Sequence, residues 1–177
     1  MILLMGVAGA GKSVEGRRLA DEMGLPWLST GEFLRMLVTG ERRREMLAGK
    51  LLSDEEVIEL ADKIFRIIDT KEQFLLDGFP RTLAQADWLF AQHKAGLMKI
   101  TCVLHLEARE EVVAQRLLGR GRQDDTEESI AKRFAEYAAV TLPILKDFES
   151  KGIKVCHINA EREPNAVHAD VLKVLES

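Results

Sequence analysis

The sequence has few of the residues that define several protein classes. Among 177 residues there are two cysteines, Cys102 and Cys156, and both lie in short apolar segments. We expect them to be small buried strand residues, which excludes a disulfide framework and favours a reducing, cytoplasmic location. No apolar run approaches the length of a membrane span, so no membrane association is expected. The net charge of −4 gives no indication of a nucleic-acid-binding surface.

What the chain does have is a regular alternation of apolar runs with longer helical patterns. Hydrophobic residues make up 46% of the sequence, enough for one domain covering residues 1–177 with a sizeable core. The predicted strands are 1–5, 26–29, 73–77, 100–106 and 153–158. Strands that alternate with helices indicate βαβ units, and hence a parallel sheet covered by helices on both faces.

Helix boundaries are marked by polar residues that can cap a first turn. Ser53 with Glu56, and Asp125 with Glu128, have the spacing of a capping box before an apolar helical stripe. Pro143 interrupts the second of these stripes, and we expect a kink there because proline lacks a backbone donor and crowds the preceding turn.

The segment Gly6-Val-Ala-Gly-Ala-Gly-Lys12-Ser13 has the complete form of a phosphate-binding loop. It follows an apolar strand and precedes a predicted helix, whose free N–H groups and dipole favour an anion. We expect Lys12 to reach the β and γ phosphates of a nucleotide, and the Ser13 hydroxyl to bind Mg²⁺.

A second motif, Asp77-Gly-Phe-Pro-Arg81, places a carboxylate at the end of another apolar run. Asp77 is expected to hold Mg²⁺, through water, opposite Ser13. Arg81 and Gln85 lie one helical turn apart and share a face. A guanidinium can bind phosphate with paired hydrogen bonds, and a carboxamide can pair with the edge of a base.

Both motifs begin at the carboxyl end of a predicted strand, where ligands bind in parallel sheets. They therefore predict one crevice in which a phosphoryl group moves between two small molecules. An acceptor phosphate is already an anionic nucleophile, so no general base is needed. We expect no catalytic role for His93, His105, His157 or His168.

With these motifs and the segments at 28–35, 49–53 and 115–133, the chain resembles the nucleoside monophosphate kinases, most closely adenylate kinases with a short lid. The resemblance covers nearly the whole length. It implies an α/β fold, a three-layer αβα P-loop kinase with a five-stranded parallel sheet. It also implies an acceptor-binding helical segment at about 30–60 and a minimal lid at about 119–125. The implied activity is Mg²⁺-dependent transfer from ATP to AMP, giving two ADP. The shortness of the acceptor-binding segment and of the lid suggests a monomer.

The resemblance also implies roles for individual residues. The implied ATP-binding residues are Gly9, Ala10, Gly11, Lys12, Ser13, Val14, Arg116 and Arg120. The implied AMP-binding residues are Thr30, Arg35, Lys50, Leu51, Leu52, Gly78, Arg81, Gln85, Arg122 and Arg133. The implied catalytic residues are Lys12, Arg81, Arg120, Arg122 and Arg133, with Ser13 and Asp77 at the magnesium ion. The carboxylates implied to orient the lid arginines are Asp124 and Asp125.

Three features depart from the family pattern. The phosphate loop reads Lys12-Ser13-Val14 where adenylate kinases usually have Lys-Gly-Thr, so position 14 has no hydroxyl. The stretch between Arg35 and Lys50 is short, with one predicted helix at about 42–47, and the charged run 41–45 is interpreted as a solvated helix face.

The lid departs most. Only 119–124 separates a helix predicted to end at Leu118 from the next helix cap. It contains no cysteine or histidine, so no zinc-bearing lid is expected. Glycines flank Arg120 and provide a hinge. A lid this short should exclude water poorly, and we expect ATP hydrolysis without an acceptor.

Other functions remain open on the sequence alone. UMP or CMP is the nearest alternative acceptor, because Gln85 argues only modestly for AMP. A small-metabolite kinase of the shikimate or gluconate type often has Gly-Lys-Ser in its loop, but it does not explain the motif from Asp77 to Gln85. A non-catalytic nucleotide-binding adaptor is favoured slightly by the short segments and opposed by the retained arginines.

Overall fold

A five-stranded parallel sheet forms the centre of the protein. The computed structural model describes residues 1–47, 52–122 and 125–176. The strands are β1 (Ile2–Met5), β2 (Trp27–Ser29), β3 (Leu75–Asp77), β4 (Cys102–Glu107) and β5 (Val155–Asn159). Their order across the sheet is β2-β3-β1-β4-β5, and all pairs are parallel. All five predicted strands are confirmed, and so is the α/β fold class.

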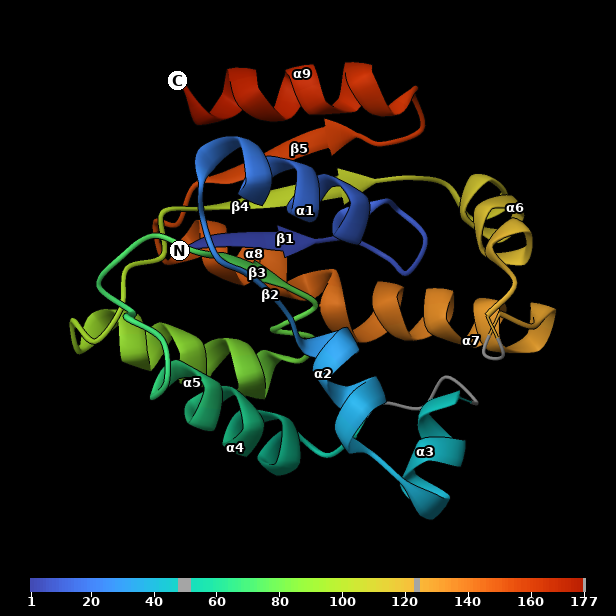
Figure 1. Cartoon of the computed structure of the whole chain (residues 1–177), viewed down its shortest axis with the longest axis horizontal. Helices are drawn as coiled ribbons and strands as arrows, with labels where there is room; N and C mark the ends of the chain where they lie inside the picture. Colours follow the sequence, from blue (N-terminus) through green and yellow to red (C-terminus); the bar gives the residue numbers. More distant parts are fainter. Residues whose placement is uncertain (48–51, 123–124, 177) are drawn as a thin grey trace.

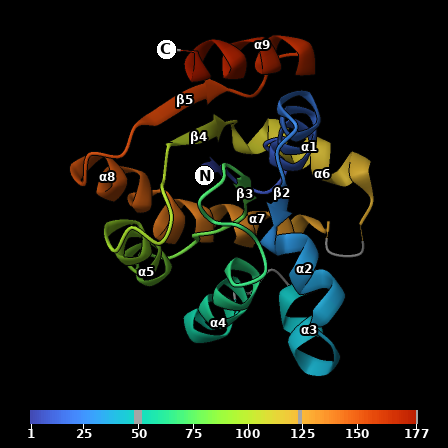
Figure 2. The same ribbon diagram turned by 60° about the vertical axis from the view of Figure 1, so that its left-hand side comes forward.

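Helices cover both faces of this sheet (Figure 1). The helices are α1 (Lys12–Met23), α2 (Thr30–Leu37), α3 (Gly40–Leu47), α4 (Asp54–Phe65), α5 (Leu83–Lys94), α6 (Glu110–Arg120), α7 (Glu127–Glu136), α8 (Pro143–Ser150) and α9 (Pro164–Leu175), with a π-helical turn, η1 (Tyr137–Thr141), between α7 and α8. In both views α9 and α3 lie at opposite ends of the molecule (Figures 1 and 2). In the part of the chain that the structure describes, no helix combines the length and apolar character needed to cross a bilayer.

The alternation of side chains along β1 divides the core into two layers. Leu3 and Met5 pack with residues of α4, α5 and α8 on one face of the sheet. Ile2 and Leu4 pack with residues of α1, α6 and α9 on the other. All four side chains are buried, as a strand in the middle of a parallel sheet requires. Cys102 and Cys156 are free, buried strand residues, as predicted.

The structure confirms one predicted helix cap and corrects the other. Ser53 Oγ accepts a hydrogen bond from Glu56 N at the start of α4. The prediction of Asp125 as the cap of α7 is wrong by one residue. Thr126 is the cap and accepts from Ser129 N, because the Asp125 carboxylate is held by Arg120.

The helix that follows α7 is interrupted in the region where the kink was predicted. Leu142 N donates to Tyr137 O across five residues, and α8 then begins at Pro143. Proline suits the first position of a helix because its missing N–H would be unpaired there. The structure therefore has a π turn followed by a new helix start.

The charged run 41–45 lies in α3, whose described side chains are mostly exposed, in agreement with the interpretation as a solvated face. Arg42 forms an ion pair with Glu56 of α4, and Arg43 Nη1 donates to Arg35 O of α2. These contacts hold α3 against the elements that precede and follow it. Helix α6 ends at Arg120, two residues later than predicted, and Gly121 caps it in the left-handed conformation.

Candidate active site

The phosphate loop connects β1 to α1 and passes close to neighbouring strands and helices. Gly6 has φ of 145°, and a Cβ there would lie 2.5 Å from Leu106 O of β4. Gly9 has φ of 87°, and a Cβ there would meet Leu117 Cγ of α6 at 2.8 Å. Only glycine fits both positions, so the motif's glycines are required by the packing of the loop as well as by its conformation. The loop ends where α1 begins at Lys12, and it therefore presents the N-terminus of that helix.

Lys12 bends back over the loop. Its Nζ donates to Gly6 O at 2.7 Å and to Val7 O at 2.9 Å. The pKa of Lys12 is lowered to about 8. Burial is the largest cause, Asp77 opposes it, and the positive charges of Arg81 and Arg120 add to it. A buried ammonium close to two guanidinium groups favours an anion at this place, because an anion offsets the repulsion between the three cations.

Asp77 lies at the carboxyl end of β3, beside β1, and it organises the hydroxyl groups around it. Ser13 Oγ donates to Asp77 Oδ2 at 2.8 Å, and Ser29 Oγ donates to the same oxygen at 3.3 Å. Thr30 Oγ1 donates to the backbone oxygen of Asp77 at 3.1 Å. The buried carboxylate and the Ser13 hydroxyl thus form an all-oxygen pair, the donor type that Mg²⁺ prefers.

Arg81 is fixed by its own motif. Its Nε donates to Gly78 O at 2.9 Å, its backbone N donates to Gln85 Oε1 at 2.8 Å, and its backbone O accepts from Thr141 Oγ1 at 2.8 Å. Burial lowers the pKa of Arg81, and Asp77 partly opposes this effect. The guanidinium is therefore held in place as a partly desolvated cation, which suits the binding of a phosphate.

Gln85 has protein partners for both ends of its buried carboxamide. Besides accepting from Arg81 N, it donates from Nε2 to Asp54 Oδ1 at 2.8 Å. Asp54 also accepts from Thr82 Oγ1 at 2.7 Å. This small network joins the start of α4 to the start of α5.

The arginines of the lid region converge on Asp125, whose side chain is 0% exposed. Arg120 makes two hydrogen bonds to this carboxylate, at 2.8 and 2.7 Å, and Arg133 Nη1 lies 3.4 Å from it. Arg122 N donates to it at 3.2 Å. Asp125 therefore links α6, the lid and α7 through one buried anion. Asp124 lies outside the described residues.

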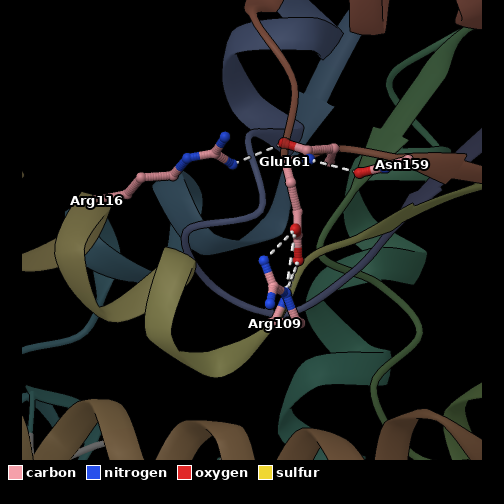
Figure 3. A network of polar contacts seen from close by, with 5 residues as sticks. Arg109, Arg116, Asn159 and Glu161 are labelled. Carbon is pink, nitrogen blue, oxygen red and sulfur yellow. Dashed lines mark hydrogen bonds and ion pairs between the residues drawn. The ribbon is translucent and has the colours of Figure 1, made fainter.

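Two arginines, Arg116 on α6 and Arg109 just before it, bind the loop that follows β5 (Figure 3). Arg116 Nη1 donates to Ala160 O at 2.8 Å, and Glu161 N donates to Asn159 Oδ1 at 2.9 Å. The Glu161 carboxylate pairs with Arg109, with Nε–Oε1 and Nη2–Oε2 distances of 2.9 Å. Arg116 is thus placed by backbone of the β5–α9 connection, beside the phosphate loop.

These segments surround one cavity of about 690 Å³. The predicted site residues that line it are Gly9, Ala10, Gly11, Lys12, Ser13, Val14, Thr30, Arg35, Leu52, Asp77, Gly78, Arg81, Gln85, Arg116, Arg120, Arg122 and Arg133. Lys50 and Leu51 lie outside the described residues. A volume of this size is at the middle of the range for small-molecule sites.

Sequence reasoning missed several residues in the walls of this cavity. Glu136, Tyr137 and Thr141 belong to the end of α7 and to η1, and residues 160–164 form the β5–α9 connection. The second group follows the carboxyl end of a strand, so the rule that ligands bind there could have found it. The first group depends on how α7 packs, which has no sequence signal of its own.

Comparison with known proteins agrees with this arrangement. Residues 4–153 match the family described as adenylate kinase. The adenylate kinase of Corynebacterium glutamicum strain R is 34% identical over 180 residues, covering 98% of each chain. That of Mycolicibacterium vanbaalenii is 35% identical with the same coverage, and that of Prochlorococcus marinus is 38% identical over 160 residues, covering 86% of each chain.

The chain belongs to the adenylate kinase family. It is therefore an enzyme of the nucleoside monophosphate kinase class, and the resemblance inferred from its motifs is confirmed. Membership of the family also accounts for the phosphate loop and the several arginines that line the same cavity.

Proposed function

We propose that the protein transfers the γ-phosphoryl group of Mg-ATP to AMP, forming two molecules of ADP. The observation that carries this proposal is that Lys12, at the phosphate loop, and Arg81, at the second motif, line the same cavity. A triphosphate at the first and a monophosphate at the second would meet inside it. Holding two reactants in one geometry supplies much of the barrier reduction in such transfers.

The catalytic apparatus in this proposal is a ring of cations. Phosphoryl transfer requires positioning and neutralisation of charge on the transferring group. Lys12, Arg81, Arg120, Arg122 and Arg133 supply positive charge from four parts of the chain. Asp125 accepts hydrogen bonds from Arg120 and Arg133 and so holds both guanidinium groups in position. The anionic oxygens of the nucleotides would accept their remaining hydrogen bonds.

Ser13 and Asp77 are the residues that would hold Mg²⁺. The hydroxyl and the carboxylate oxygen are 2.8 Å apart and beside the phosphate loop, so their chemistry fits this ion. When bound, the ion would neutralise charge on the β and γ phosphates.

The acceptor side combines Thr30, Arg35, Leu52, Gly78, Arg81 and Gln85 in the proposal. Gln85 is assigned to the adenine base, and its bond to Asp54 fixes the orientation of the carboxamide. A base that pairs with Gln85 therefore meets a carboxamide whose oxygen and nitrogen each already have one protein partner. The monomeric state and the cytoplasmic location stay predictions from the sequence.

An acceptor panel tests the proposal. ADP release from Mg-ATP is followed by a coupled assay with AMP, CMP, UMP, GMP and shikimate. We expect AMP to give the highest kcat/KM. Preference for UMP or CMP would identify a pyrimidine kinase, turnover of shikimate a metabolite kinase, and no turnover with any acceptor an adaptor. No observation on the structure favours these alternatives, and the named relatives are all adenylate kinases.

A further inference from the structure

A second group of titratable side chains lies outside the set of residues that line the nucleotide cavity. His105 on β4 and His157 on β5 occupy paired positions of the sheet, and Glu107 follows two residues after His105 on the same face. Because the two strands are paired at these positions, the imidazoles of His105 and His157 lie next to each other. None of the roles assigned above uses these three residues.

The three donor atoms form a nearly equilateral triangle. His105 Nδ1 lies 3.2 Å from His157 Nδ1 and 3.2 Å from Glu107 Oε1, and His157 Nδ1 lies 2.8 Å from Glu107 Oε1. An ion bound at about 2.0–2.2 Å to each donor places the donors about 2.8–3.6 Å apart, from octahedral to tetrahedral coordination. The observed triangle matches one face of such a coordination polyhedron.

An oxygen atom lies near each of the remaining ring nitrogens, within hydrogen-bond distance for His105 and within ion-pair distance for His157. His105 Nε2 lies 2.5 Å from Tyr137 Oη, and His157 Nε2 lies 3.7 Å from Glu149 Oε1. A histidine that binds a metal through one nitrogen nearly always directs the other N–H to such an acceptor, which fixes the tautomer. Both Nδ1 atoms lie within 3.2 Å of Glu107 Oε1, and metal binding here would release the proton that an imidazole shares with the carboxylate.

The cluster is also accessible. The His105 side chain is 4% exposed and forms the inner wall, whereas those of His157 and Glu107 are 47% and 50% exposed. His105, Glu107 and Tyr137 line a second cavity of about 540 Å³, which leaves room for water at further coordination positions. A divalent ion can enter from solvent without unfolding the sheet.

We propose that His105, His157 and Glu107 form a binding site for a divalent transition-metal ion of the zinc, cobalt or nickel class. Two imidazole nitrogens and one carboxylate oxygen suit these ions, whereas Mg²⁺ prefers oxygen donors. The site is distinct from the all-oxygen pair of Ser13 and Asp77. It would extend the metal chemistry of the chain beyond magnesium, since the expectation of no zinc rested on the lid alone.

Cobalt titration of the full-length, nucleotide-free enzyme tests this site. The protein is stripped with a chelator and titrated with Co²⁺ in millimolar Mg²⁺, which occupies oxygen sites. We expect visible d–d absorption that saturates at one equivalent and disappears when Zn²⁺ is added. His157→Ala and Glu107→Gln should each weaken Co²⁺ binding by at least about tenfold, since second-sphere changes alone cost that much. Both side chains are half exposed, so these variants should fold.

Controls make the outcome unambiguous. His93→Asn removes an imidazole outside this cluster, whose Nδ1 lies 3.3 Å from Met98 O and from Ile100 N, and it should leave Co²⁺ affinity unchanged. Phosphoryl transfer by His157→Ala shows that this variant is folded. The site is refuted if no saturable band appears, if His157→Ala binds Co²⁺ as tightly as the unmodified protein, or if a strong near-ultraviolet thiolate band places the ion on Cys102 or Cys156.

Discussion

Ser13 and Asp77 are 64 positions apart, yet Ser13 Oγ donates a hydrogen bond of 2.8 Å to Asp77 Oδ2. The contact exists because β1 pairs with β3, with Leu4 opposite Asp77, so both strands end at the same edge of the sheet. The two motifs recognised in the sequence are thus parts of one site. The hydrogen bond marks the place at which we expect magnesium.

Asp77→Asn should impair magnesium use specifically. The amide keeps the shape of the carboxylate but removes its charge, so we expect kcat to fall by about 10²–10³ and the Mg²⁺ requirement to rise. The measurement is the rate as a function of free Mg²⁺ at saturating nucleotide. Ser29→Ala is the matched control, because Ser29 touches the same oxygen at 3.3 Å without an assigned role at the metal. An unchanged Mg²⁺ dependence in Asp77→Asn would remove Asp77 from the metal site.

Arg81→Ala should abolish most of the transfer while the protein remains folded. Loss of one charge-stabilising donor in an active site costs about 10²–10³ in turnover. Steady-state rates with AMP are compared with thermal unfolding of the same preparation. Arg66→Ala removes an exposed arginine paired only with Asp62 on its own helix, and should change neither quantity. Near-normal activity in Arg81→Ala would mean that the acceptor site is misassigned.

Asp125→Asn should lower stability in a pH-dependent manner. Burial raises the pKa of Asp125, but hydrogen bonds and charge from Arg120 outweigh this effect and hold the pKa below its usual value. A carboxyl with a depressed pKa stabilises the fold above its unfolded pKa of about 3.9, and this contribution is lost as the pH falls through the lower folded value.

The measurement is urea unfolding of both proteins at several pH values. The free energy of unfolding should favour the unmodified protein at pH 7, and the difference should shrink below about pH 4. A difference that stays constant down to pH 3 would show that the negative charge of Asp125 does not contribute to the free energy of unfolding.

The sequence predicts the sheet and both motifs because each depends on local patterns. Apolar runs give the strands, and the glycines of the loop are fixed by spacing. The sequence does not predict contacts for which several side chains compete, because the outcome depends on the three-dimensional arrangement. Asp125 was expected to cap α7, but Arg120 binds its carboxylate and Thr126 caps the helix.

Gln85, which is predicted to bind the acceptor base, is another residue whose protein contacts the sequence does not predict. Its partner Asp54 lies 31 positions away, and no spacing rule connects them. The π turn from Tyr137 to Thr141 likewise has no pattern of its own in the sequence: Leu142 N donates to Tyr137 O immediately before α8 begins at Pro143. The roles of the lid residues stay predictions, and Asp124, Lys50 and Leu51 lie outside the described residues.

His168→Ala should destabilise the fold. His168 is buried between Glu15 Oε1 and Glu22 Oε2, each at 2.7 Å, and joins α9 to α1. Its loss leaves the buried Glu15 carboxylate without this hydrogen bond, and an unsatisfied buried polar group costs about 1–3 kcal/mol. Urea unfolding gives the value. His157→Ala, which removes a half-exposed imidazole, is the control and should cost far less. Equal losses in the two variants would contradict the role of the Glu15–His168 contact.

The short connection between α6 and α7 should permit uncoupled ATP hydrolysis. Only four residues, 121–124, separate Arg120 from Asp125, and lid closure is what normally excludes water from the reacting group. We expect phosphate release from Mg-ATP in the absence of AMP, measured with a sensitive phosphate assay. The Lys12→Ala variant corrects for contaminating phosphatases. No release above that background would show that even this lid closes the site.

The central claim is tested most directly by following the transferred group itself. The enzyme is incubated with Mg-ATP labelled at the γ phosphate and with unlabelled AMP, and the products are separated by chromatography. The account predicts that the label appears in the β phosphate of ADP, with two ADP formed for each ATP consumed. Label found only in inorganic phosphate, or retained in ATP, would contradict it.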